Sequence, residues 1–61
     1  MDGKDEQILK YLKEKGKLCV KDIADGVGMS PATTSKYLFS LLSQKKVKKD
    51  VKLPYTYYEA A

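Results

Sequence analysis

The stretch Ser30–Gln44, SPATTSKYLFSLLSQ, decides the fold of this chain. Serine is a preferred N-cap and proline suits the first helical position, so Ser30 and Pro31 indicate where a helix begins. After Pro31, mainly apolar residues recur at the spacing that places them on one face of a helix: Thr34, Leu38, Leu41 and Leu42. The sequence therefore predicts a helix over residues 31–44.

The opposite face of this expected helix carries no carboxylate. It consists of small or hydroxylated side chains, one cation and one ring: Ala32, Thr33, Ser35, Lys36, Phe39 and Ser40. A surface helix normally mixes acidic and basic residues there, whereas an acid-free face can approach a polyanion without repulsion. We interpret residues 31–44 as the recognition helix of a small DNA-binding domain.

Length and composition restrict the class of protein. A chain of 61 residues is expected to form one domain, residues 1–61, that buries about 60% of its unfolded surface, which leaves little room for a catalytic cleft. Cys19 is the single cysteine and histidine is absent, so we expect neither an internal disulfide nor a zinc cluster. We therefore expect no enzymatic activity, no small-molecule substrate and no cofactor.

The cellular compartment of the protein is predicted from two further observations. No apolar run approaches the roughly 18 residues of a membrane span, and the polar N-terminus MDGKDEQ is unlike a signal peptide. A cytoplasmic protein, or a nuclear one in a eukaryote, is expected, either as a whole chain or as a fragment of a longer one.

The charge is unevenly distributed. The net charge is +4, and residues 1–35 balance six lysines against six acids. Residues 36–61 hold six lysines against Asp50 and Glu59, so the whole excess lies in this part. A one-sided basic patch is typical of a nucleic-acid binder, and its alternative is a lysine surface kept for solubility.

Two more helices are expected before the first stretch, over residues 5–15 and 21–27. Gly16 and Gly28 are placed to end them. The connection from residue 27 to the next helix is about three residues long, as in a helix-turn-helix. Residues 17–20 alternate in character and can form an edge strand.

A β-hairpin is expected over residues 46–60, because a lysine-rich run is followed by a proline turn and then by tyrosines. The predicted fold is α+β: three helices and a small antiparallel hairpin. One of Tyr57 and Tyr58 must face the core, since strand neighbours alternate. Cys19 is expected near the N-cap of the second helix, with Asp22 three residues later at the position of a capping-box acid. Its side chain is expected to be a small buried apolar group.

The segment VKDIADGVGMSPATTSKYLFSLLSQKKV, residues 20–47, resembles the winged-helix family of DNA-binding domains, in particular small repressors of the ArsR, MarR and Lrp type. That resemblance covers nearly the whole chain and implies a winged helix-turn-helix fold. Many relatives have a glycine at the end of the third helix, where this chain has Lys45. A left-handed Lys45 would cost about 1 kcal/mol relative to glycine.

A second resemblance is to the Zα domains that bind left-handed DNA. Their recognition helix carries an asparagine and a tyrosine four residues later, and here Ser35 and Phe39 stand at these positions. Their wing carries two prolines and a tryptophan, and here Pro54, Tyr55 and Tyr57 stand there. The spacing is kept, but the asparagine, the tyrosine hydroxyl and the second proline are lost.

The resemblance implies that the third helix enters the major groove and that the wing reaches phosphates or the minor groove. The residues expected to contact DNA are Ala32, Thr33, Ser35, Lys36, Phe39 and Ser40 in the helix, and Lys45, Lys46, Lys48, Lys49, Lys52, Pro54, Tyr55 and Tyr57 in and around the hairpin. Phe39 is expected either to contact DNA or, by preference, to pack under the wing against Tyr57. Arginine is absent, so phosphate contacts should dominate and sequence preference should be modest.

The expected partner is double-stranded DNA, bound by a monomer or a weak homodimer, with transcriptional regulation as the role. Two alternatives stay open at this point. One is Zα-like binding of left-handed DNA or RNA, and the other is a winged helix that serves as a protein–protein interaction module.

Overall fold

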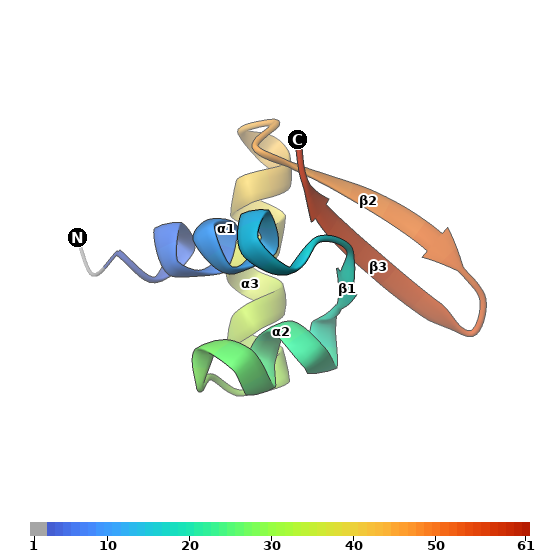
Figure 1. The fold of residues 1–61 in the computed structure, drawn as a ribbon, viewed down its shortest axis with the longest axis horizontal. Helices are drawn as coiled ribbons and strands as arrows, with labels where there is room; N and C mark the ends of the chain where they lie inside the picture. The colour runs from blue at the N-terminus through green and yellow to red at the C-terminus, as the bar shows by residue number, and fades with distance from the viewer. Residues whose placement is uncertain (1–2) are drawn as a thin grey trace.

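The structure is a computed structural model and describes residues 3–61. The elements, in chain order, are α1 (Lys4–Lys15), β1 (Leu18–Cys19), α2 (Val20–Val27), α3 (Pro31–Ser43), β2 (Val47–Lys52) and β3 (Tyr55–Ala60). Figure 1 shows α3 running behind α1 and α2, and the β2–β3 hairpin projecting to one side as a wing. The expected α+β arrangement is confirmed, and each helix has bounds within one residue of those predicted from the sequence.

The three strands form one antiparallel sheet in the order β1-β3-β2, so the expected edge strand is present and β3 lies in the middle. Leu18 pairs with Tyr58 across β1 and β3, and Lys49 pairs with the same tyrosine from β2. Residues that lie opposite each other share a face of the sheet. We call the face of Tyr58 the inner face, with Leu18, Val47, Lys49, Val51, Thr56, Tyr58 and Ala60. The outer face carries Cys19, Lys48, Asp50, Lys52, Tyr55, Tyr57 and Glu59.

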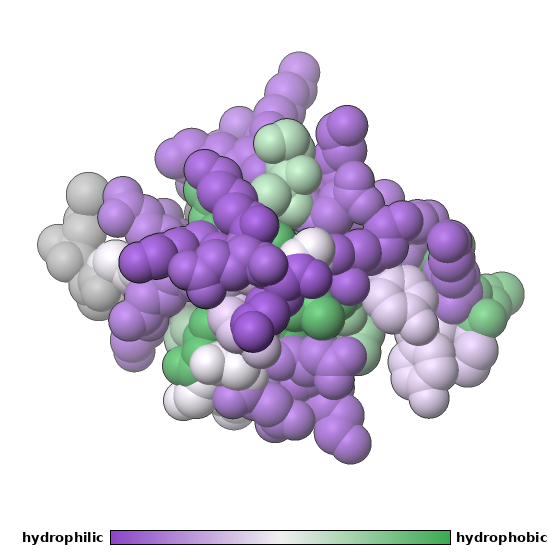
Figure 2. Space-filling view, viewed as in Figure 1, coloured by the Kyte–Doolittle hydropathy of each residue, from purple (hydrophilic) through white to green (hydrophobic). Residues whose placement is uncertain are grey.

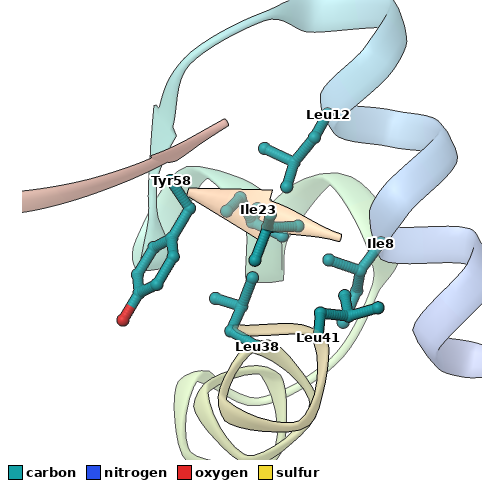
Figure 3. Close-up of a cluster of buried hydrophobic side chains, with 7 residues drawn as sticks. Ile8, Leu12, Ile23, Leu38, Leu41 and Tyr58 are labelled. Atoms are coloured by element: carbon teal, nitrogen blue, oxygen red, sulfur yellow. The ribbon is translucent and has the colours of Figure 1, made fainter. Parts of the chain in front are cut away.

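The core lies between the helices and the inner face of the sheet. Figure 3 shows side chains from all three helices and from β3 pointing toward one another, while the hydroxyl of Tyr58 points away from the cluster. The buried apolar cluster is Ile8, Leu12, Ile23, Leu38, Leu41, Val47 and Tyr58. Tyr58 therefore faces the core, and Tyr57 lies on the other side of the strand, as alternation requires.

The buried Thr34 is the exception to an otherwise apolar set of core residues. It is 0% exposed, and its hydroxyl has no hydrogen-bond partner among the residues that the structure describes. A buried hydroxyl without a partner lowers the stability of the fold.

Both ends of α3 follow from the local sequence. The Ser30 hydroxyl accepts a hydrogen bond from the Thr33 backbone N–H at 3.2 Å, which caps the first turn. At the other end, the Lys45 N–H donates to the Leu42 carbonyl at 3.0 Å and the Lys46 N–H donates to the Leu41 carbonyl at 2.9 Å. This is a Schellman motif, and it places Lys45 at a φ of 60°. Lys45 therefore adopts the left-handed conformation at the position where many relatives have glycine.

Helix α2 begins without a side-chain cap. Cys19 occupies the N-cap position but accepts no capping hydrogen bond. Its thiol instead donates to the Asp22 carboxylate, with 3.3 Å between sulfur and oxygen. The expectation of a buried, apolar Cys19 is wrong, because the residue is half-buried on the outer face of the sheet and is held by a polar contact.

The surface of the molecule is mostly hydrophilic. Figure 2 shows purple side chains over most of the visible face, with green patches between the helices and a further green patch at the end of the wing. The large hydrophobic residues that are exposed are Phe39, Val51, Leu53 and Tyr55. Three of these four belong to the wing, and the fourth lies on α3.

Candidate nucleic-acid interface

The outward face of α3 is open to solvent. Ala32, Lys36, Phe39 and Ser40 are exposed, and Thr33 and Ser35 are half-buried at its margins. The opposite side of the helix is sealed in the core by Thr34, Leu38 and Leu41. A partner can therefore reach a helix face that carries one cation and no carboxylate.

The hydroxyl groups on this face already make local hydrogen bonds. The Ser30 hydroxyl lies 2.9 Å from that of Thr33, and the Gln44 side-chain amide donates to the Ser40 hydroxyl at 3.1 Å. A hydroxyl can donate one hydrogen bond and accept others, so Thr33 and Ser40 keep capacity for a ligand. These contacts fix the orientation of both side chains in the absence of a partner.

Phe39 does not pack under the wing, so that expectation is wrong. Its side chain is 66% exposed, and Tyr57 lies on the outer face of the sheet, whereas the helices cover the inner face. Tyr57 instead contacts Tyr55, with ring centroids 6.3 Å apart and an angle of 59° between the ring planes. The two rings that the Zα resemblance aligns with the helix tyrosine and the wing tryptophan are thus not in contact with each other.

The lysines follow α3 directly. Only residues 44–46 separate α3 from β2, so the basic run begins where the helix ends. The side chains of Lys45, Lys46, Lys48, Lys49 and Lys52 are all exposed. The structure therefore brings the cations of residues 45–52 into one ribbon that continues from the C-terminal end of α3.

Both acids of the wing are bound by a lysine that sequence reasoning missed. Lys17 lies just before β1, and its Nζ is 2.7 Å from the Asp50 carboxylate and 3.4 Å from the Glu59 carboxylate. Lys52 lies 3.8 Å from the same Asp50 oxygen. The hydrogen bond with Lys17 lowers the pKa of Asp50 below its usual value and raises the pKa of Lys17 above its own. The negative charge of the wing is thus neutralised on its outer face.

The two faces of the wing differ in chemistry. The exposed part of the inner face consists of Lys49 and Val51 next to the half-buried Thr56, and it carries no carboxylate. The outer face carries Asp50 and Glu59 together with Tyr55 and Tyr57. The wing residues expected to contact DNA are therefore divided between both faces and the turn. Lys49 lies on the inner face and Tyr57 on the outer one.

Two other features concern ligands and membranes. Among residues 3–61, no group of three or more cysteine, aspartate or glutamate side chains is placed to hold a metal ion. None of the helices in the described part is long and apolar enough to cross a bilayer.

Comparison with known proteins gives one family match. A family model described as winged helix-turn-helix DNA-binding matches residues 1–48 of the chain. No curated protein matches the chain at a significant level of sequence similarity.

Several solved structures have the same fold. Fragment 1–100 of a possible transcriptional regulatory protein from Mycobacterium bovis is 33% identical, with a TM-score of 0.89, over 98% of this chain and 63% of that one. A solution structure of that fragment is described as a homodimeric winged helix-turn-helix DNA-binding domain of a possible ArsR-family regulator, and this chain spans 55% of it.

Zα domains are similar as well. The Zα domain of zebrafish PKZ is 26% identical, with a TM-score of 0.86, over 92% of this chain and 88% of that one. The Zα domain of Carassius auratus PKZ, solved in complex with Z-DNA, is 21% identical, with a TM-score of 0.87, over 95% of this chain and 92% of that one. The similarity to the Carassius domain concerns the fold alone.

Proposed function

Because this chain belongs to the winged helix-turn-helix DNA-binding family, we propose that it binds double-stranded DNA through the outward face of α3 and the lysine ribbon of the wing. We propose further that it is the DNA-binding module of a transcriptional regulator. The similarity to the Mycobacterium bovis fragment supports this role, although this chain spans less than two thirds of that fragment.

The observation that carries the proposal is that exposed lysines continue along the chain from the acid-free outward face of α3 into the wing, where they lie on both of its faces. Lys36 is exposed in the middle of α3, and five exposed lysines follow the end of the helix. The two acids of the hairpin are held by Lys17. A duplex that approaches this surface therefore meets positive charge, and the two carboxylates of the hairpin are already paired with Lys17 and Lys52.

The expected mode of binding follows from the side chains that are present. Lys36 and the wing lysines neutralise phosphates, and Ala32, Ser35 and Thr33 face the bases or the sugar–phosphate backbone. Arginine, which most often reads guanine with two hydrogen bonds, is absent from the chain. We therefore propose binding dominated by phosphate contacts, with weak base specificity and a steep dependence on salt.

The test is a binding titration of a fluorescently labelled duplex of about 20 base pairs at several salt concentrations. The Lys36→Ala/Lys48→Ala double variant should bind more weakly at low salt. Its plot of log K against log salt should be less steep by about 0.9 per lost phosphate contact. The matched control is Lys10→Ala/Lys13→Ala, which removes the same charge from exposed positions of α1. Equal affinities and slopes in both double variants would contradict the proposal.

A second candidate is recognition of left-handed DNA. The fold similarity to a Zα domain solved with Z-DNA favours this candidate. The residue types count against an equivalent contact set, because Ser35, Phe39 and Tyr55 stand where the Zα resemblance has asparagine, tyrosine and the second proline. Circular dichroism of an alternating CG duplex decides the question, because a left-handed duplex inverts the spectrum. A spectrum that stays unchanged at saturating protein removes this candidate.

We propose no catalytic role for the chain, which is a DNA-binding domain by family. We also propose that residues 1–61 form one domain and that it acts in the cytoplasm, or in the nucleus if its source is a eukaryote. Its proposed state is a monomer or a weak homodimer, which sedimentation at micromolar concentrations would establish.

A further inference from the structure

The turn of the wing is apolar and almost fully exposed. Leu53 and Pro54 alone connect β2 to β3, and Leu53 is 89% exposed. Val51 and Tyr55 beside them are 57% and 58% exposed. Figure 2 shows a green patch at the far end of the wing, next to paler side chains. The Leu53–Pro54 peptide bond is cis, as in the turn type that carries proline at its third position, and the leucine before it is not one of the residue types that turns favour.

Lysines surround the apolar turn of the wing. Lys52, next to the tip, has a side chain that is 65% exposed, and Lys48 and Lys49 precede it on opposite faces of β2. Lys17 holds Asp50 and Glu59, the acids of the hairpin. This combination of charge and apolar surface suits a partner that is anionic outside and apolar inside. A DNA duplex, with phosphates outside and stacked bases within, has this character.

The size of the wing determines which residues can reach the bases. Strands of six residues are about 20 Å long, so the wing can extend from a helix in the major groove to the neighbouring minor groove. The backbones of two paired strands lie about 4.8 Å apart, and side chains project from both faces. The body of the hairpin is therefore wider than a minor groove of about 6 Å. Only the two-residue turn can therefore enter.

The side chains of the turn cannot read base edges by hydrogen bonding. Leucine has no polar side-chain group, and proline lacks even its backbone N–H. An apolar side chain in the minor groove acts instead as a wedge, which partly unstacks a base step and bends the duplex toward the major groove. Pyrimidine–purine steps such as TA and CA yield most readily to this deformation.

We propose that Leu53, supported by Pro54, is an apolar wedge that enters the minor groove, unstacks a flexible pyrimidine–purine step and bends the bound duplex. This inference rests on the proposed DNA binding and adds a source of specificity to it. The chain selects sites by how easily the DNA deforms at the position of the wing tip, without hydrogen bonds to the bases there.

The experiment uses the full chain and duplexes of about 20 base pairs that carry 2-aminopurine in a single TA step, with a donor and an acceptor dye at the two ends. The wild-type chain should raise the 2-aminopurine fluorescence and bring the ends closer. Leu53→Ala should lose both signals, with less than about a tenfold loss of affinity and an unchanged salt slope, because the phosphate contacts remain. Leu53→Lys should also lose both signals while it binds at least as tightly. Val51→Ala is the matched control, because it shortens an exposed apolar side chain below the tip.

Each other result overturns the inference in a distinguishable way. Duplex binding without unstacking or bending by the wild-type chain refutes the wedge and leaves the proposed function intact. Absence of duplex binding at low salt refutes both. Sedimentation with phosphatidylserine vesicles that depends on Leu53, without a 2-aminopurine signal on DNA, assigns the tip to a lipid surface instead. The Leu53 variants should have the same melting temperature as the wild-type chain, since the Leu53 side chain is exposed.

Discussion

Replacing Lys45 by glycine should stabilise the fold and weaken DNA binding at the same time. Lys45 has a φ of 60°, and it is the one non-glycine residue with a positive φ in the part of the chain that the structure describes. An L-residue in this conformation costs about 1–2 kcal/mol, whereas glycine adopts it freely. Glycine also makes the unfolded chain more flexible, which offsets part of the gain. We expect a net stabilisation of about 0.5–1 kcal/mol.

The magnitude is large enough to measure. For a domain of this size, 1 kcal/mol corresponds to a change in Tm of about 4–8 °C, so Lys45→Gly should melt roughly 2–8 °C higher than the wild-type chain by circular dichroism. Lys46→Gly is the matched control, because it removes the same charge from the adjacent residue, which has no left-handed conformation to relieve. It should leave Tm unchanged or lower it.

The binding of both variants completes the experiment. Each loses one cation next to α3, so each should show a salt slope reduced by about 1 if its lysine contacts a phosphate. A Lys45→Gly variant that is no more stable than Lys46→Gly would refute the reasoning about backbone strain. A variant that is more stable yet binds DNA with the wild-type salt slope would remove Lys45 from the interface.

Three further predictions concern the core and the ion pairs. Thr34→Val should raise the free energy of unfolding, measured in urea, by about 1 kcal/mol, because a methyl group replaces a buried hydroxyl that has no hydrogen-bond partner. A loss of stability would show that this hydroxyl is hydrogen-bonded. Lys17→Met should weaken duplex binding at low salt more than Lys10→Met does, because it leaves two carboxylates on the wing without their Lys17 partner. Equal duplex affinities of the two variants would show that Lys17 does not aid binding in this way. The lowered pKa of Asp50 means that its pairing with Lys17 stabilises the folded state above about pH 3.8 and that this contribution is lost as pH falls through the lowered value. Melting curves between pH 2 and 5 should show that loss in the wild-type chain, and Asp50→Asn should not show it.

Local signals in the sequence predicted the helices and the hairpin. Ser30 and Pro31 gave the start of α3 because capping depends only on neighbouring residues, and Pro54 gave the turn of the wing for the same reason. The left-handed Lys45 could be anticipated because a position after a helix where relatives have glycine needs a positive φ. Such features involve groups a few residues apart and need no knowledge of the tertiary structure.

The errors concern long-range geometry. Phe39 was expected by preference to pack under the wing against Tyr57 because its ring is large and apolar, yet the ring is 66% exposed and Tyr57 lies on the outer face of the sheet. Lys17 gave no signal at all, because its partner Asp50 is 33 residues away and the register of the sheet sets their separation. The register also decides which wing residues share a face, and no local pattern specifies it.

The strand order β1-β3-β2 also has a bearing on how the molecule assembles. The helices can pack through contacts close together in sequence, but Leu18 finds its strand partner only at Tyr58. The hairpin of β2 and β3 can pair locally across its two-residue turn, so the pairing of β3 with β1 is the long-range step that completes the sheet. The wing is therefore tied to the helical body through β3, a strand that follows all three helices in the chain.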